Sequence, residues 1–176
     1  MSGHNKWSKI KHKKAASDSQ RSKIFGKISK LIASESKRVG GDITAPTLRA
    51  VIEKAKEVNM PSDNIDRAVK KGMSADATTM ESVQYEVYGP GGCGIIIEGL
   101  TDNNNRTAQE IKHLLSKNGF ALAAPGSASW MFTKGDGGFE ATMTVDLSDE
   151  DGAKLEVLLE LLEEHDDVQE VYTNAN

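Results

Sequence analysis

The chain has very little cysteine, because Cys93 is the only one among its 176 residues. A single thiol excludes an intrachain disulfide framework and favours a reducing compartment. No apolar run approaches the roughly 18 residues that a membrane helix needs, and the first residues lack the apolar core of a signal peptide. These absences predict a cytoplasmic protein that does not enter a membrane.

Sequence motifs for catalysis and metal binding are also absent. The four histidines share no metal-ligand spacing, and no nucleophile elbow or Ser/His/Asp order is visible. The segment 89–94 (GPGGCG) lacks the phosphate-loop pattern and precedes a predicted strand, so we interpret it as a hairpin turn. Cys93 has no second cysteine or paired histidine near it, which argues against metal ligation. We therefore predict no enzyme activity, no cofactor and no metal.

Charge is distributed very unevenly along the chain. Residues 1–72 contain 17 Lys and Arg against 7 Asp and Glu, a net charge of +10. Residues 73–176 contain 5 against 19, a net charge of −14, so the overall charge of −4 hides a basic part joined to an acidic part. The basic part indicates a polyanionic partner, most commonly nucleic acid. A solvated basic tail without a partner is the alternative.

The first 16 residues form a basic arm that has no helical period and no acidic side chain. Closely spaced lysines neutralise phosphates, and a tryptophan among them can stack on an unpaired base. A merely solubilising tail is the alternative. The candidate nucleic-acid contacts in the arm are Lys6, Trp7, Lys9, Lys11, His12, Lys13 and Lys14.

Three helices are predicted after the arm. Apolar side chains recur at helical spacing over residues 17–39, and two glycines end this helix. A second helix is expected over 46–58 with a proline in its first turn, and a third over 62–72 with Ser62 as its cap. Helices this short must pack together, so we predict a three-helix nucleic-acid-binding domain over 17–78. Its first helix adds candidate phosphate contacts: Arg21, Lys23, Lys27 and Lys30.

Residues 79–176 change to a mixture of strands and helices. A helix is expected after Asn104 or Asn105 as cap, and another after Ser148 with Asp151 in a capping box. The order predicts an α+β fold with a ferredoxin-like domain, in which an antiparallel sheet carries two helices on one face. The predicted strands are 83–88, 94–100, 127–132, 139–147 and 168–172.

The start of the helix that is expected after Asn104 or Asn105 is unusually dense in polar side chains. Free N–H groups at a helix N-terminus can hold an anion, although capping and turn formation explain many of the same residues. We regard this segment as a candidate contact for an anion or a partner. The residues are Asn103, Asn104, Asn105 and Arg106.

Several long segments closely resemble the YebC/PmpR family and together span almost the whole chain. They are GHNKWSKIKHKKAASDSQRSKIFGKISKLI, IEKAKEVNMPSDNIDRAVKKG, TDNNNRTAQEIKHLLSKNGF with PGSASWMF, and DDVQEVYTNAN. The resemblance implies a three-helix N-terminal domain and a DNA-binding transcriptional regulator of the cytoplasm. It also implies a second role, because other members resemble translation activators that act on the ribosome, in some cases easing synthesis of proline-rich stretches.

The chain departs from the family pattern at one place. Family members typically continue after the match to Phe132 into a further small α/β domain, whereas here only 133–138 precedes the next predicted strand. The chain therefore resembles a compact variant that lacks the inserted domain. Such a deletion is physically tolerable, because a short glycine-rich turn can close two neighbouring strands as a hairpin.

Together these features predict a non-enzymatic regulator of gene expression that binds DNA through the arm and the three-helix domain. The first alternative is a ribosome-associated translation factor whose arm binds ribosomal RNA, because a Lys/Trp arm suits irregular RNA and no helix offers an evident sequence-reading face. The second is an adaptor whose sheet binds a protein or an effector. The sequence leaves the oligomeric state open and is compatible with a monomer.

Overall fold

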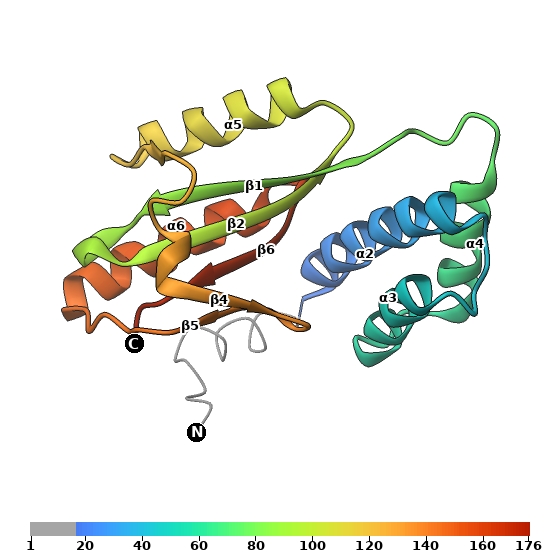
Figure 1. The fold of residues 1–176 in the computed structure, drawn as a ribbon, viewed down its shortest axis with the longest axis horizontal. Helices are drawn as coiled ribbons and strands as arrows, with labels where there is room; N and C mark the ends of the chain where they lie inside the picture. Colours follow the sequence, from blue (N-terminus) through green and yellow to red (C-terminus); the bar gives the residue numbers. More distant parts are fainter. Residues whose placement is uncertain (1–16) are drawn as a thin grey trace. The chain divides into compact units, whose positions relative to one another are not determined.

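The computed structural model describes residues 17–176 (Figure 1). Within them the chain forms two compact units, a helical unit that ends at Glu81 and an α+β unit, Ser82–Asn176. No helix in the described part of the chain is long and apolar enough to cross a membrane. The basic arm, residues 1–16, lies outside the described residues.

The helical unit contains the three predicted helices, which are α2 (Asp18–Val39), α3 (Pro46–Glu57) and α4 (Ser62–Met73). The side chain of Ser17 caps α2 by accepting from the backbone N–H of Gln20. The helix ends at Gly40, whose φ of +64° few other residues adopt. The predicted cap of the third helix is wrong, because Pro61 is the N-cap and makes no side-chain cap bond.

The core of the helical unit joins all three helices. Ile32, Leu48 and Ala55 have no exposed surface, and further apolar side chains pack around them. Helices α2 and α4 approach closely where Gly72 faces α2, and the hydroxyl of Ser36 donates to the carbonyl oxygen of Val69 at 2.7 Å. A Cβ on Gly72 would collide with the carbonyl oxygen of Ala33 and come within 2.7 Å of the Ser36 Cβ. The small size of Gly72 therefore sets the distance between the two helices.

We expect Gly72→Ala to destabilise the helical unit by about 1–3 kcal/mol, because the added methyl group overpacks the α2–α4 contact. This sign is opposite to the usual gain of roughly 0.5–1 kcal/mol when a helical glycine becomes alanine. Gly26→Ala is the matched control, because a Cβ there meets nothing within 4 Å. Hydrogen exchange of the α2 and α4 amides measures both effects. Stabilisation by Gly72→Ala would contradict the close packing.

The α+β unit is built on a sheet of four strands in the order β3-β1-β2-β6. Figure 1 labels β1, β2 and β6 of this sheet. Strand β1 pairs antiparallel with β3, and β2 pairs antiparallel with β6. A separate antiparallel hairpin contains β4 and β5. The strands are β1 (Glu81–Tyr88), β2 (Gly94–Thr101), β3 (Leu122–Ala123), β4 (Phe132–Gly135), β5 (Gly138–Ala141) and β6 (Val168–Thr173).

Two helices, α5 (Asn104–Lys117) and α6 (Asp149–Glu164), cover one face of this sheet. Val87, Ile95 and Ile97 point into this layer, where they pack with leucines of both helices. Because strand residues alternate between faces, Ile96 lies on the opposite face and packs with Met131 and Phe132. The predicted α+β fold, with an antiparallel sheet and two helices on one face, is confirmed.

The β4–β5 hairpin is joined to the opposite face by a compact set of contacts. Lys134 lies 2.9 Å from the carboxylate of Glu98, and Tyr172 donates a hydrogen bond to the same carboxylate at 3.2 Å. The ring of Phe139 packs edge-on against Tyr172, with centroids 5.4 Å apart. Burial, and then the negative charge of Glu98, raise the pKa of the Tyr172 hydroxyl. These contacts therefore anchor the β4–β5 hairpin to the sheet, at the place where the sequence predicts that an inserted domain is missing.

The predicted turn at 89–94 is confirmed, because the 3-10 turn η1 (Pro90–Gly92) connects β1 to β2. Gly91 and Gly92 have φ values of +64° and +76°, which only glycine adopts easily. Cys93 is buried at the end of the turn, and burial raises the pKa of its thiol. The glycines therefore provide the backbone conformations that the β1–β2 turn requires.

Two of the predicted strands have the wrong extent. Ser129–Met131 forms a 3-10 turn, η2, rather than part of a strand over 127–132, and β5 ends at Ala141 rather than at residue 147. The backbone N–H groups of Ala128 and Ser129 donate to the side chain of Glu86, so they are not available to a strand partner. The predicted Ser148 cap is confirmed, because its hydroxyl accepts from the N–H of Asp151.

Candidate nucleic-acid interface and a polar network

The predicted nucleic-acid contacts fall into two groups. The seven arm residues from Lys6 to Lys14 lie outside the described residues. The other four, Arg21, Lys23, Lys27 and Lys30, all belong to α2, where the first two are exposed and the last two are partly exposed. The arm and the segment 17–72 each carry a net charge of +5, so α2 and its neighbours contribute as much positive charge as the arm.

Other cations of the helical unit stabilise its own structure. Lys37 donates to the carbonyl oxygen of Ala77 at 2.6 Å and to the hydroxyl of Thr79 at 2.8 Å. Arg38 pairs with Glu35 on the same helix at 2.6 Å and donates to the hydroxyl of Thr47 at 2.7 Å. These two side chains hold the end of α2 to surrounding segments. The remaining exposed cations of α3 and α4 are Arg49, Lys54, Lys56, Arg67, Lys70 and Lys71.

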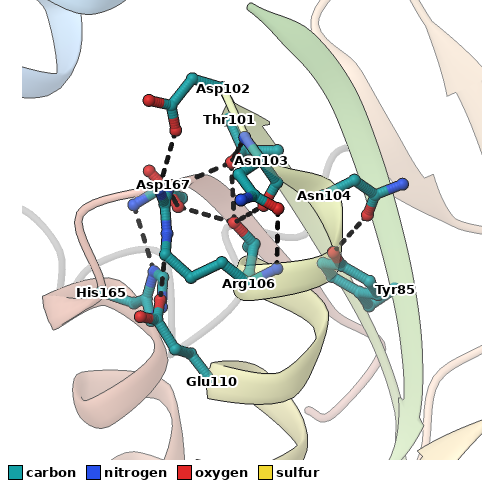
Figure 2. Close-up of polar contacts among 10 residues, drawn as sticks. Tyr85, Thr101, Asp102, Asn103, Asn104, Arg106, Glu110, His165 and Asp167 are labelled. Carbon is teal, nitrogen blue, oxygen red and sulfur yellow. Dashed lines mark hydrogen bonds and ion pairs between the residues drawn. The ribbon is translucent and has the colours of Figure 1, made fainter.

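The polar start of α5 is a capped helix end (Figure 2). Asn103 is the N-cap, and its side-chain oxygen accepts from the backbone N–H of Arg106 at 3.1 Å. The predicted caps Asn104 and Asn105 are therefore wrong by one or two positions. Asn104 instead accepts from the hydroxyl of Tyr85 at 3.1 Å, and Asn105 is exposed.

Arg106 is surrounded by carboxylates (Figure 2). Its guanidinium lies 2.7 Å from Asp167 and 2.9 Å from Asp102, with Glu110 at 3.9 Å. The hydrogen bonds that Arg106 donates to Asp167, and then to Asp102, raise the pKa of Arg106. Because these carboxylates compensate its charge, an anion at Arg106 would have to compete with three fixed negative groups. The proposed anion contact stays a prediction, and this geometry favours internal pairing.

Asp167 is the buried centre of this network, with 5% of its surface exposed. Besides Arg106 it accepts a hydrogen bond from the hydroxyl of Thr107 at 2.7 Å, and Thr107 contacts the Thr101 hydroxyl at 2.8 Å. The carbonyl oxygen of Asp167 accepts from the N–H of Leu100 at 2.8 Å. The network therefore ties β2, the start of α5 and the segment before β6 together.

The atoms of Glu110, His165 and Asp167 that could coordinate a metal ion lie within 4.8 Å of one another. The sequence did not indicate this cluster, because Glu110 and His165 are 55 residues apart. His165 Nδ1 accepts from the N–H of Asp167, so in the neutral ring Nε2 carries the proton and donates it to Glu110 at 2.9 Å. A metal would have to displace this proton and share Asp167 with Arg106, so the arrangement favours an ion-pair network over a metal centre.

We expect Asp167→Asn to destabilise the α+β unit by roughly 2 kcal/mol, because a buried charged acceptor of two hydrogen bonds is lost. Asp166→Asn is the matched control, because Asp166 is the residue next to Asp167 and its side chain is exposed. Urea unfolding followed by Trp130 fluorescence compares the two variants. Equal midpoints for Asp167→Asn and Asp166→Asn would show that the network contributes nothing to stability.

A second buried carboxylate, Glu86 on β1, organises the loop that precedes β4. It accepts from the backbone N–H groups of Gly126, Ala128 and Ser129 at 2.7–2.8 Å. Burial alone would raise the pKa of the Glu86 carboxyl, but these donors outweigh burial and hold the pKa below its ordinary value. No spacing rule connects Glu86 to residues forty positions later, so this anchor was missed in the sequence.

Comparison with protein families identifies both units. The TACO1/YebC protein N-terminal domain matches residues 5–75, and the TACO1/YebC second and third domain matches residues 80–136 and 135–175. The chain belongs to the TACO1/YebC family. The two segments of the second match meet in the β4–β5 turn, where the sequence predicts that an inserted domain is missing.

Relatives in this family carry the name "probable transcriptional regulatory protein". The Halothermothrix orenii protein is 47% identical over 165 residues, covering 93% of this chain and 63% of the relative. The Fervidobacterium nodosum protein is 52% identical over 136 residues, covering 76% of this chain and 54% of the relative. The chain thus spans 54–63% of the length of these TACO1/YebC relatives.

A solved structure has the same fold. The conserved hypothetical protein Aq1575 from Aquifex aeolicus aligns with a TM-score of 0.78 and 29% identity, covering 90% of this chain and 91% of that one. This extensive match supports the α+β architecture of the TACO1/YebC chain described above.

Proposed function

We propose that this protein is a non-enzymatic cytoplasmic regulator of gene expression that binds DNA through its basic N-terminal half. The separation of charge between the two halves of the chain carries this proposal. Residues 1–72 have a net charge of +10, whereas Ser82–Asn176 has 5 Lys and Arg against 17 Asp and Glu. Basic side chains attract the phosphate backbone, and the acidic unit limits indiscriminate binding. The names of the relatives support the regulatory role.

In this proposal, basic side chains of α2 contribute to the interface in addition to those of the arm. Arg21 and Lys23 are exposed near its start. Lys27 and Lys30 extend the basic side chains along the same helix. Such residues bind phosphates without reading bases, so they add affinity to that of the arm.

A second candidate function is a translation factor that binds ribosomal RNA. Three of the four basic contacts on α2 are lysines, and lysines mostly position a protein on a nucleic acid rather than specify a sequence. Trp7 in the arm also suits an unpaired base, which irregular RNA offers more often than duplex DNA does. The two functions share the same basic surface and differ in target.

Partition of the full chain between ribosomes and promoter-length duplex DNA distinguishes these functions. The protein is sedimented with ribosomes and, separately, titrated into labelled promoter and scrambled duplexes near physiological salt. Selective retention on one promoter duplex supports the DNA regulator. Tight ribosome binding with weak, sequence-blind DNA binding would replace it with the translation factor. Binding to neither would overturn both functions and favour an adaptor.

A further inference from the structure

Two large aromatic side chains of the acidic unit remain exposed although their polar atoms are internally bonded. Trp130 in η2 is 62% exposed and Tyr88 at the end of β1 is 45% exposed. The indole N–H of Trp130 donates to the carbonyl oxygen of Ser127 at 2.8 Å, and the hydroxyl of Tyr88 donates to the same oxygen. The two side chains therefore lie side by side, and their polar atoms are already used. What they offer to a partner is the faces of their rings.

Hydrogen bonds to Glu86 hold the loop that carries Trp130 in place. The carboxylate of Glu86 accepts three of its backbone N–H groups, from Gly126, Ala128 and Ser129. Met131, next to Trp130, is buried against Ile96. Three hydrogen bonds and a core contact thus fix the backbone on either side of the exposed indole. A fixed surface loses little entropy on binding, which favours recognition.

The charge around this aromatic pair selects the partner. Residues 118–133 contain no charged side chain, so nothing in this loop attracts a phosphate. Alternation along the strands places Glu86, Glu98 and Glu170 on the same sheet face as Ile96. Glu98 pairs with Lys134, and Glu86 is buried and accepts three backbone N–H groups, so the attraction rests on the net charge of the unit. With 17 acidic and 5 basic side chains in Ser82–Asn176, the unit attracts cations and repels a nucleic-acid backbone.

We propose that Trp130 and Tyr88 form a docking surface for a positively charged, arginine-containing segment of a protein partner. A guanidinium stacks on an indole face more favourably than on any other aromatic face. It needs no hydrogen bond from the ring edge, which matches the internal bonding of both side chains. The negative charge of the unit draws the same segment in. This surface is separate from the basic interface of the proposed function and does not depend on it.

The test follows the indole N–H signal of Trp130 in the full ¹⁵N-labelled chain, assigned by comparison with Trp7→Phe. Four probes are titrated near physiological salt. They are a short Arg-Gly peptide, the same peptide with neutral citrulline in place of arginine, an uncharged Pro-Gly-Ser peptide and a single-stranded oligonucleotide. We expect only the arginine peptide to shift the Trp130 signal. A larger shift with either uncharged peptide or with the oligonucleotide would overturn the proposal.

Variants separate the aromatic pair from general attraction to an acidic surface. Trp130→Ala should weaken binding of the arginine peptide about tenfold, through loss of the stacked guanidinium, whereas Trp130→Phe should retain most of it. Val157→Ala is the control, because Val157 is 54% exposed on α6 and outside this surface. Unchanged peptide affinity in Trp130→Ala would overturn the proposal. If Trp130→Ala lowers the stability of the fold, the titration of the wild-type chain with the four probes still tests the proposal.

Discussion

Reversal of Lys9, Lys11, Lys13 and Lys14 to glutamate is expected to abolish nucleic-acid binding. The four changes lower the net charge of residues 1–72 from +10 to +2. Each lysine that neutralises a phosphate releases counterions on binding, and each glutamate that replaces it repels the same phosphate. We expect affinity for duplex DNA and for ribosomal RNA fragments to fall by roughly a hundredfold or more at moderate salt. Fluorescence anisotropy with labelled nucleic acid measures this loss.

Two control variants assign the loss to the charge of the arm. The same four lysines changed to arginine keep the charge and should keep most of the affinity. Reversal of Lys112 and Lys117, both exposed on α5 in the acidic unit, should leave affinity almost unchanged. If the four glutamates leave affinity intact, the arm is a solubilising tail and the proposed interface is wrong.

Replacement of Glu86 by glutamine is expected to cause the largest loss of stability in the α+β unit. The carboxylate accepts three backbone N–H groups, and a glutamine amide turns donors toward some of them. Hydrogen bonds to a buried charge are costly to break, so we expect the free energy of unfolding to fall by about 2–4 kcal/mol. Urea unfolding at neutral pH measures the loss, with Glu140→Gln on β5 as an exposed control.

The same variant should also change the pH dependence of stability. The pKa of Glu86 is lower in the folded state than its ordinary value of 4.5. A lowered pKa means that Glu86 stabilises the fold fully above 4.5, and that this contribution is lost as pH falls through the folded-state pKa. Glu86→Gln should therefore lose less stability than wild type on acidification. Parallel curves of unfolding free energy against pH for the two proteins would contradict this account.

The helices were predictable because local sequence determines them. Apolar spacing and the glycines after residue 39 predicted a helix over 17–39, and α2 spans Asp18–Val39. The capping box at Ser148 was equally visible, since its partner Asp151 is three residues away. The hairpin turn between β1 and β2 followed from its glycines and Pro90. Each of these features depends on residues a few positions apart.

The structural features that could not be predicted from the sequence depend on contacts between residues that are far apart along the chain. Strand β3 has only two residues, too few to show any alternation, and it exists because it pairs with Glu86 and Val87. The 3-10 turn η2 depends on hydrogen bonds to Glu86, about forty residues earlier. The pairing of Arg106 with Asp167 spans 61 residues. A single sequence has no local signal for such contacts.

We propose that the basic N-terminal half binds nucleic acid through phosphate contacts. The most direct measurement is the affinity of the full chain for duplex DNA across a salt series. If about six phosphates are neutralised, log K should fall with log salt at a slope near −5. A slope near zero, or no binding even at low salt, would contradict the claim.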